Sequence, residues 1–346
     1  MTWFKARQIR WFVGSLLVLG ALGTVAAQMT PEEAAAQYDF DLSDVDLVTT
    51  SSLESPLLMP QGYMLDMLVA WGAEVEIVTL TTTSGVQALI ANRSNLAPHG
   101  ADELLIGAAE GADLVAIGSP QSKINYVLAA KNDIDSVEAL EGKTIGMSGP
   151  AGFDALLTRF SLADVGLDPE TDVNFVQIGG SPDRAAALLA GRVDAVTIGL
   201  DDWFELANQT DDVHLLQYMS EVVPDFATEL YFSRREFIDA NPELALAIAC
   251  GNLEANQWAN ENRDAFIAYT MERVPGLEEG PVVELYDAAM EVGMWPTEPE
   301  AVLSTSGLQG LMEAMLETGD IANPVEVANY IDISFLEEAA QMGCGQ

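Results

Sequence analysis

A strand-and-helix pattern that occurs twice is the feature that most constrains the fold of this chain. Shifting the sequence by 99 residues places TTSGVQALIANR (82–93) over SPDRAAALLAGR (181–192). The register continues, since Gly100 then lies over Gly199. Each copy contains a strand, a polar loop, a helix, a tight turn and a second strand. Two copies do not indicate a solenoid, which needs at least three repeats, so the pattern predicts two similar α/β lobes.

Short apolar runs alternate with amphipathic segments along most of the chain. Such alternation favours parallel sheets covered by helices. We therefore expect strands at 47–50, 74–80, 95–98, 113–118, 144–147, 173–178, 195–198 and 230–233. We expect a helix at 57–71 and another that follows the strand at 74–80 and ends at 92. Further helices are expected at 101–110, 153–164, 182–190, 201–207, 243–261, 265–273, 281–292 and 301–317.

The predicted elements divide into two lobes with a cleft between them. Residues 46–122 together with 228–346 form lobe 1, which includes the C-terminal helices, and residues 123–227 form lobe 2. Residues 28–45 are polar and acidic, and we expect a flexible lead-in there. In open α/β sheets, ligands bind beyond the carboxyl ends of the strands. Closure of two lobes around a ligand is a hinge motion that needs no chemistry.

Loops rich in glycine and hydroxyl groups follow several of the predicted strands. Residues 148–152 and 179–182 each lead into a helix, whose first N–H groups are unpaired donors. Alternatively, these residues only form turns and caps. Because residues 81–84 hold an equivalent position in lobe 1, we expect ligand contacts in all three loops. The candidate ligand-binding residues are Ser51, Ser52, Thr83, Ser84, His99, Gly100, Ser148, Gly149, Gly152, Phe153, Gly180, Ser181, Asp201 and Trp203.

Aromatic and charged candidates at the predicted cleft carry less weight. Phe153 and Trp203 could stack on a planar ligand, although aromatic side chains more often belong to a core. Acids occur in every loop of this chain, so Asp201 is not distinctive. Lys123 and Arg184 are the bases placed near the predicted cleft, and an anionic ligand would depend on them and on backbone donors.

The N-terminus has the order of a secretory signal. Lys5, Arg7 and Arg10 precede an apolar run over residues 11–25, and small residues follow up to Ala27. The run is short for a membrane span, which needs about 20 residues. We predict cleavage after Ala27 and export to the periplasm or outer cell surface, with an uncleaved anchor as the alternative.

The charge of the chain excludes one large class of partner. The full sequence has 54 acids and 14 bases, and 11 bases remain once the three in the signal are removed. Such a chain repels phosphate backbones, so we expect no nucleic-acid partner. About half of the residues are hydrophobic, which argues against disorder. A high-salt, halophilic habitat fits this charge, because salt screens self-repulsion.

Cysteine and histidine are scarce. Cys250 and Cys344 could form a disulfide in an exported protein, or remain two separate buried thiols. His99 and His214 are the only histidines, and neither belongs to a Cys/His cluster. We therefore expect no metal, no cofactor and no catalytic residues, and the protein is interpreted as not an enzyme.

Several segments resemble one family closely. They are GKTIGMSG (142–149), GLDP (166–169), VQIGGSPDRAAALLAGRVDA (176–195), GADLVAIG (111–118) and YVLAA (126–130). The sequence is similar here to the nitrate/sulfonate/taurine and thiamine-pyrimidine-precursor group of ABC importer substrate-binding proteins. The resemblance covers about residues 46–275 and implies a type II periplasmic-binding fold with a two-strand hinge.

The resemblance implies a function in solute capture. A monomeric protein of this kind holds a small molecule between its lobes and delivers it to a membrane permease. Residues 55–63, SPLLMPQGY, depart from the family pattern, so the ligand cannot be carried over. We expect a small planar heterocycle or pyrimidine-like precursor first, and a sulfonate or similar oxyanion second. Alternatives are a solute-binding sensory protein, or an exported enzyme with the fold of pyrimidine-precursor synthases.

Overall fold

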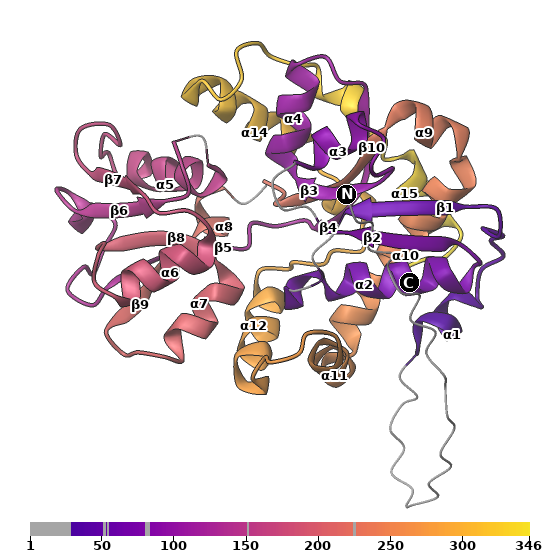
Figure 1. Cartoon of the computed structure of the whole chain (residues 1–346), viewed down its shortest axis with the longest axis horizontal. Helices are drawn as coiled ribbons and strands as arrows, with labels where there is room; N and C mark the ends of the chain where they lie inside the picture. Colours follow the sequence, from indigo (N-terminus) through magenta and orange to yellow (C-terminus); the bar gives the residue numbers. More distant parts are fainter. Residues whose placement is uncertain (1–28, 51–52, 54, 80–83, 151, 224–225) are drawn as a thin grey trace, which may run out of the picture.

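Two groups of strands, joined by two crossings of the chain, organise this computed structural model (Figure 1). The structure describes residues 29–346 except 51–52, 54, 80–83, 151 and 224–225, and the predicted signal at 1–27 lies outside that range. One group contains β1–β4 and β10, and the other contains β5–β9. We call these groups with their helices lobe 1 and lobe 2. No helix of the described residues is both long and apolar enough for a membrane span.

Lobe 1 contains a mixed arrangement of strands. β1 (Asp46–Thr50) pairs in parallel with β2 (Glu74–Val78), and an isolated parallel bridge from Thr49 to Leu96 leads to the next strand. β10 (Glu229–Arg234) lies antiparallel between β3 (Ala97–Gly100) and β4 (Leu114–Gln121). The spatial order is therefore β2, β1, β3, β10, β4.

Lobe 2 repeats this order with different strands. Its single sheet runs β7, β6, β8, β5, β9, where β5 is antiparallel to both of its neighbours. The strands are β5 (Tyr126–Lys131), β6 (Thr144–Met147), β7 (Asn174–Gln177), β8 (Ala195–Gly199) and β9 (Val213–Tyr218). In each lobe, the strand that arrives directly from the other lobe occupies the fourth, antiparallel position. This shared order is what the 99-residue echo in the sequence reflects.

The sheets differ from the expected parallel sheets because of these arriving strands. β5 and β9 were not predicted as strands, and β5 makes the sheet of lobe 2 mixed. The apolar run of β5 is short, and Val127, Leu128, Ala129 and Ala130 are buried in the middle of the sheet. A run buried on both faces has no alternating pattern from which a strand can be recognised.

Helices cover the faces of both sheets and form the C-terminal region (Figure 1). The predicted helix at 301–317 is two helices, because Ser304 caps a new helix by accepting a hydrogen bond from the Gly307 N–H. The helices of lobe 1 before the first crossing are α1 (Pro31–Ala35), α2 (Met59–Ala70), α3 (Gly85–Ile90) and α4 (Ala101–Ala109), with the 3-10 turn η1 (Pro56–Leu58). Lobe 2 has α5 (Phe153–Asp164), α6 (Ser181–Leu189), α7 (Leu200–Ala207) and α8 (Met219–Val222). The C-terminal helices are α9 (Arg235–Ala240), α10 (Pro242–Glu261), α11 (Arg263–Arg273), α12 (Glu279–Glu291), α13 (Pro299–Val302), α14 (Thr305–Thr318) and α15 (Ser334–Gln341).

Residues 29–45 are packed against lobe 1, so the prediction of a flexible lead-in is wrong for them. Thr30 and Glu33 form a capping box at the start of α1. Trp71 donates from Nε1 to the Ala35 carbonyl at 2.8 Å, and the Leu42 side chain is buried. The segment has enough apolar side chains among its acids to add to the core.

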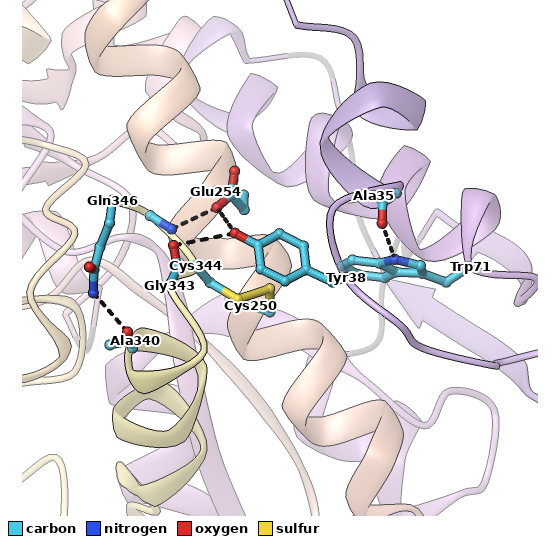
Figure 2. Close-up of a disulfide and its surroundings, with 10 residues drawn as sticks. Ala35, Tyr38, Trp71, Cys250, Glu254, Ala340, Gly343, Cys344 and Gln346 are labelled. Atoms are coloured by element: carbon cyan, nitrogen blue, oxygen red, sulfur yellow. Dashed lines mark hydrogen bonds between the residues drawn. A yellow bond between two sulfur atoms is a disulfide. The ribbon is translucent and has the colours of Figure 1, made fainter.

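A disulfide joins the C-terminal tail to the long helix α10. Cys250 and Cys344 are bonded, with their Cα atoms 5.2 Å apart. Beside the disulfide, the Tyr38 hydroxyl donates to Glu254, which also accepts from the Gly345 N–H at 2.7 Å (Figure 2). The N-terminal segment, α10 and the tail therefore meet at one point.

Breaking this disulfide should destabilise the protein. The bond closes a loop with a sequence separation of 94, and loop-closure entropy predicts a loss of about 4–5 kcal/mol on its removal. We expect Cys250→Ala/Cys344→Ala to lower the free energy of unfolding by about 2–5 kcal/mol, measured by chemical denaturation. A reductant should destabilise the wild type and leave the double variant unchanged. An equal effect of the reductant on both proteins would contradict this prediction.

Candidate ligand-binding cleft

Two helices of matching position begin at the crossings between the lobes. Gly100 is the N-cap of α4 in lobe 1, and Gly199 is the N-cap of α7 in lobe 2. The first N–H of α4 donates to the Thr228 carbonyl at 3.2 Å, and the first N–H of α7 donates to the Asn125 carbonyl at 2.7 Å. Since residues 125 and 228 belong to the two crossings, each helix is held directly by one of them.

A cavity of about 680 Å³ lies between the lobes next to α7. Lobe 2 contributes the start of α6 and the length of α7, while lobe 1 contributes η1, the loop before α12 and α12 itself. Helices α7 and α12 lie against each other here (Figure 1). Its lining residues are Ser55, Pro56, Pro182, Asp201, Asp202, Glu205, Asn208, Gln209, Gly276, Leu277, Glu278, Pro281, Val282 and Leu285. The volume is in the range of small-molecule sites.

Carboxylates from both lobes gather where α4, α7 and β10 meet. Burial, together with the charges of Glu103, Asp201 and Asp102, raises the pKa of Glu229 from 4.5 to about 8. Burial and the neighbouring charge of Glu103 raise the pKa of Asp102 to about 6. Burial and Asp201 likewise raise the pKa of Asp202 to about 6. These five residues, Asp102, Glu103, Asp201, Asp202 and Glu229, are called the cleft carboxylates below.

His99, near the end of β3, belongs to a network of polar contacts in lobe 1. Its Nε2 lies 3.0 Å from the Thr50 hydroxyl, and its Nδ1 lies 3.8 Å from Glu103, which accepts from the Gly85 N–H at 2.9 Å. Burial lowers the pKa of His99. Gly85 has to be glycine because a Cβ there would lie 2.5 Å from the imidazole ring. The network joins β1, β3, α3 and α4, and Thr50 is only 1% exposed.

A buried ion pair holds the corresponding loop of lobe 2. Asp154 accepts from the Ser148 N–H at 2.9 Å and also from its hydroxyl, and it lies 3.5 Å from Arg184. Arg184 is 2% exposed and donates to the carbonyls of Thr197 and Gly179 at 2.9 and 2.6 Å. The guanidinium is therefore already paired, and it positions the 148–152 and 179–182 loops.

The structure separates the predicted site residues into several groups. Asp201 lines the cavity, and Ser181, at the start of α6, accepts from the Gly199 N–H at 2.9 Å. Phe153 packs edge-on against Tyr126, with ring centroids 5.9 Å apart, and Trp203 lies in the core with 8% exposed. Ser84, Gly100, Gly152 and Gly180 are helix N-caps. Ser51, Ser52 and Thr83 lie outside the described residues, and ligand contact by the predicted set stays a prediction.

Sequence reasoning did not find the lobe 1 wall of the cavity or Glu229. Most of this wall comes from residues 276–285, which are about 200 positions from the predicted loops of lobe 1 and approach α7 only through the tertiary fold. Glu229 comes directly before the predicted strand 230–233, where a single acid among 54 gives no signal. Only its burial among other carboxylates distinguishes it.

The partly buried carboxylates predict that stability falls as the pH rises from about 5 to 8.5. The folded protein keeps a proton on Glu229 that the unfolded chain releases above pH 4.5, so it binds more protons than the unfolded chain across this range. A shift of one pK unit corresponds to about 1.4 kcal/mol of folding stability when the group is fully shielded from water. Water partly shields the charge on Glu229, so we expect the free energy of unfolding to fall by only about 2 kcal/mol over this range. Chemical denaturation of wild type and Glu229→Gln in 1 M NaCl tests this. The exposed Glu236→Gln is the control, and a slope that Glu229→Gln does not flatten would contradict the assignment.

Solved structures of other proteins share this fold. The structure superposes on the periplasmic aliphatic sulphonate binding protein SsuA from Escherichia coli with a TM-score of 0.67 and 20% identity, covering 83% of this chain and 97% of that one. It superposes on the desulfurization enzyme DszB with a TM-score of 0.64 and 17% identity, covering 86% and 99%. The two-lobed α/β fold of periplasmic binding proteins, which the sequence predicted, is therefore confirmed.

Sequence comparison gives the family. The nitrate/nitrite binding protein NrtA of Nostoc sp. (strain PCC 7120 / SAG 25.82 / UTEX 2576) is 29% identical over 157 residues, which are 43% of this chain and 35% of that protein. The match thus spans about a third of the length of this curated relative. The profile described as NMT1/THI5 like matches residues 69–265, more than half of the chain. The chain belongs to the NMT1/THI5-like family.

Proposed function

We propose that this protein captures a small solute between its lobes and delivers it to the permease of an ABC importer. The observation that carries the proposal is the cavity of about 680 Å³, lined by residues of both lobes where α7 meets α12. A cavity walled by two bodies can open and close when they rotate about the crossings between them. The periplasmic sulphonate-binding neighbour has the same fold, and the nitrate/nitrite-binding relative matches part of the sequence.

The proposal includes the setting in which the protein works. It acts as a monomer outside the cytoplasm, after cleavage of the signal at Ala27, with lobe boundaries near residues 123 and 228. The basic, apolar and small-residue order of residues 1–27 supports export, and so does a disulfide between Cys250 and Cys344. The acidic composition supports a high-salt habitat.

An enzyme is the second candidate, because the desulfurization enzyme DszB shares the fold. Thr50, His99 and Glu103 lie in the order of a nucleophile, a base and an acid. However, Thr50 is 1% exposed, and it is not among the described residues that line the cavity. Both cysteines are in the disulfide, so neither offers a thiolate. Binding without turnover is therefore the function that we favour.

Blocking the cavity should abolish solute binding without unfolding the protein. Gln209 is exposed in the turn that follows α7 and lines the cavity, so Gln209→Trp fills space that a ligand needs. Native mass spectrometry of gently purified wild type should show a retained small molecule, and the variant should have lost it. Gln341→Trp, an exposed position on α15, is the matched control. Retention by both variants would place the ligand elsewhere.

Closure of the two lobes around the ligand can be measured on the same proteins. Small-angle scattering of the wild type should show a smaller radius of gyration with the retained ligand than after its removal by partial unfolding and refolding. Chemical change of the solute during incubation, detected by the same mass spectrometry, would favour the enzyme instead. Ligand at 100 times its Kd should add about 2.7 kcal/mol to stability.

A further inference from the structure

We propose that the cleft takes a small organic cation, a molecule carrying a protonated amine or amidine group. This inference rests on the proposed function and names the chemical class of the solute. It departs from the anions named for the two binding proteins to which the chain is similar, nitrate and sulphonate.

The charges that line the cavity all have one sign. Among the described residues, its charged lining consists of Asp201, Asp202, Glu205 and Glu278. Asp201 also acts on Glu229, which in turn is close to Asp102 and Glu103 of lobe 1. Asp201 and Asp202 belong both to the cavity lining and to the cleft carboxylates, so the cavity adjoins the acidic groups of both lobes. An anion would meet repulsion on every side, whereas a cation would be attracted.

An unpaired acceptor beside the carboxylates points to a ligand that donates hydrogen bonds. Gln121 is 1% exposed, and its Oε1 has no hydrogen-bond partner among the described residues. Gln121 pairs directly with Glu229 across the β4–β10 ladder, so both side chains lie on the same face of the sheet. A buried acceptor without a partner is costly. A ligand N–H group placed between Gln121 and Glu229 would remove this cost.

A second unpaired acceptor lies on the crossing into lobe 2. The Oδ1 atom of Asn125 is buried and lacks a hydrogen-bond partner among the described residues. The carbonyl of the same residue accepts from the first N–H of α7, which places Asn125 next to Asp201. Two unpaired acceptors, at the end of β4 and on the crossing that follows it, thus lie near carboxylates from both lobes.

The basic groups near this region do not offset its charge. Arg184 is paired with Asp154 and two carbonyls, and Lys123 has an interaction partner of its own. Burial and the repulsion between neighbouring carboxylates raise the pKa of Glu229, Asp102 and Asp202, and these bases do not reverse that shift. Once Glu229 of lobe 1 has ionised, its repulsion with Asp201 of lobe 2 opposes closure. A cation between them would remove that repulsion and favour the closed form.

The size of the cavity favours an organic cation over a metal ion. A volume of about 680 Å³ is far larger than one ion needs and suits a molecule of drug-like size. In the part of the chain that the structure describes, no three acidic, imidazole or thiol groups converge on one point as metal ligands would. An amine or amidine can instead reach several separated acceptors at once.

Pairs of probes that share a shape but differ in charge test the inference. Thermal unfolding of the ligand-free full-length mature protein is measured at pH 8.5 in 1 M NaCl. The probes are benzamidinium against benzoate, propylammonium against propionate, and nitrate, ethanesulfonate, MgCl₂ and CaCl₂. We expect the organic cations to raise the melting temperature and the anions and metal salts to leave it unchanged.

Variants connect the binding to the cleft carboxylates. Glu229→Gln should weaken benzamidinium binding roughly tenfold or more, because a charge-assisted hydrogen bond is lost. Glu236→Gln, at an exposed site on α9, is the matched control and should bind as the wild type does. Benzamidinium stays charged over the range used, so its affinity should rise by up to about tenfold per pH unit between pH 6 and 8 as Glu229 ionises. The groups that face Glu229 are Asp102 and Glu103 from α4, Asp201 from α7, Tyr126 from β5 and Tyr231 on its own strand.

The outcomes separate the inference from the proposed function. Binding of nitrate, ethanesulfonate or benzoate without any cation overturns the inference and leaves a solute-binding protein. Stabilisation by MgCl₂ or CaCl₂ alone overturns the organic class. Cation binding that Glu229→Gln leaves unchanged also overturns the inference, since the site would lie elsewhere. If no probe binds and the purified protein retains no small molecule, the proposed function and the inference fail together.

Discussion

The rest of this structure depends on two short crossings of the chain, because they hold the starts of α4 and α7. The carbonyls of Thr228 and Asn125 accept the first N–H groups of these helices. Directly after each crossing, the chain enters the other lobe as its antiparallel strand, β5 or β10. A movement of the lobes about the crossings therefore moves two helix N-termini and their acids relative to each other. The acids at the starts of α4 and α7 therefore lie next to the two crossings between the lobes.

Acidic residues have two different physical roles in this chain. Most of the 54 acids are exposed on the surface, where their charges are solvated. The cleft carboxylates differ because burial and mutual repulsion raise the pKa values of most of them. Acids in the first turn of a helix are normally stabilised by the helix dipole, and at Asp102 and Asp202 burial and crowding outweigh that effect. The cleft is consequently an acceptor-rich site on a fold that also occurs in a sulphonate-binding protein.

Much of the fold could be predicted because its signals are local. Most of the strands and helices of both lobes were found from apolar periodicity, and the 99-residue echo predicted two similar lobes. The failures have local causes too. Strand β5 is buried on both faces and lacks alternation, and residues 29–45 were too acidic to suggest that Leu42 and Ala35 would be buried. The disulfide was one of two open alternatives until the tail and α10 were placed side by side.

The sequence by itself determined the family and the two-lobed α/β architecture, since both depend on short-range patterns of residues. The tertiary structure alone decided the wall of the cavity and its charge. Residues 276–285 reach α7 only through the packing of the C-terminal helices, and Glu229 meets Asp102 and Asp201 only where the two lobes meet. The physical reason is that burial and the distances between charges are properties of the folded chain. In a sequence with many acids, the identity of one residue as an acid predicts neither its burial nor its neighbours.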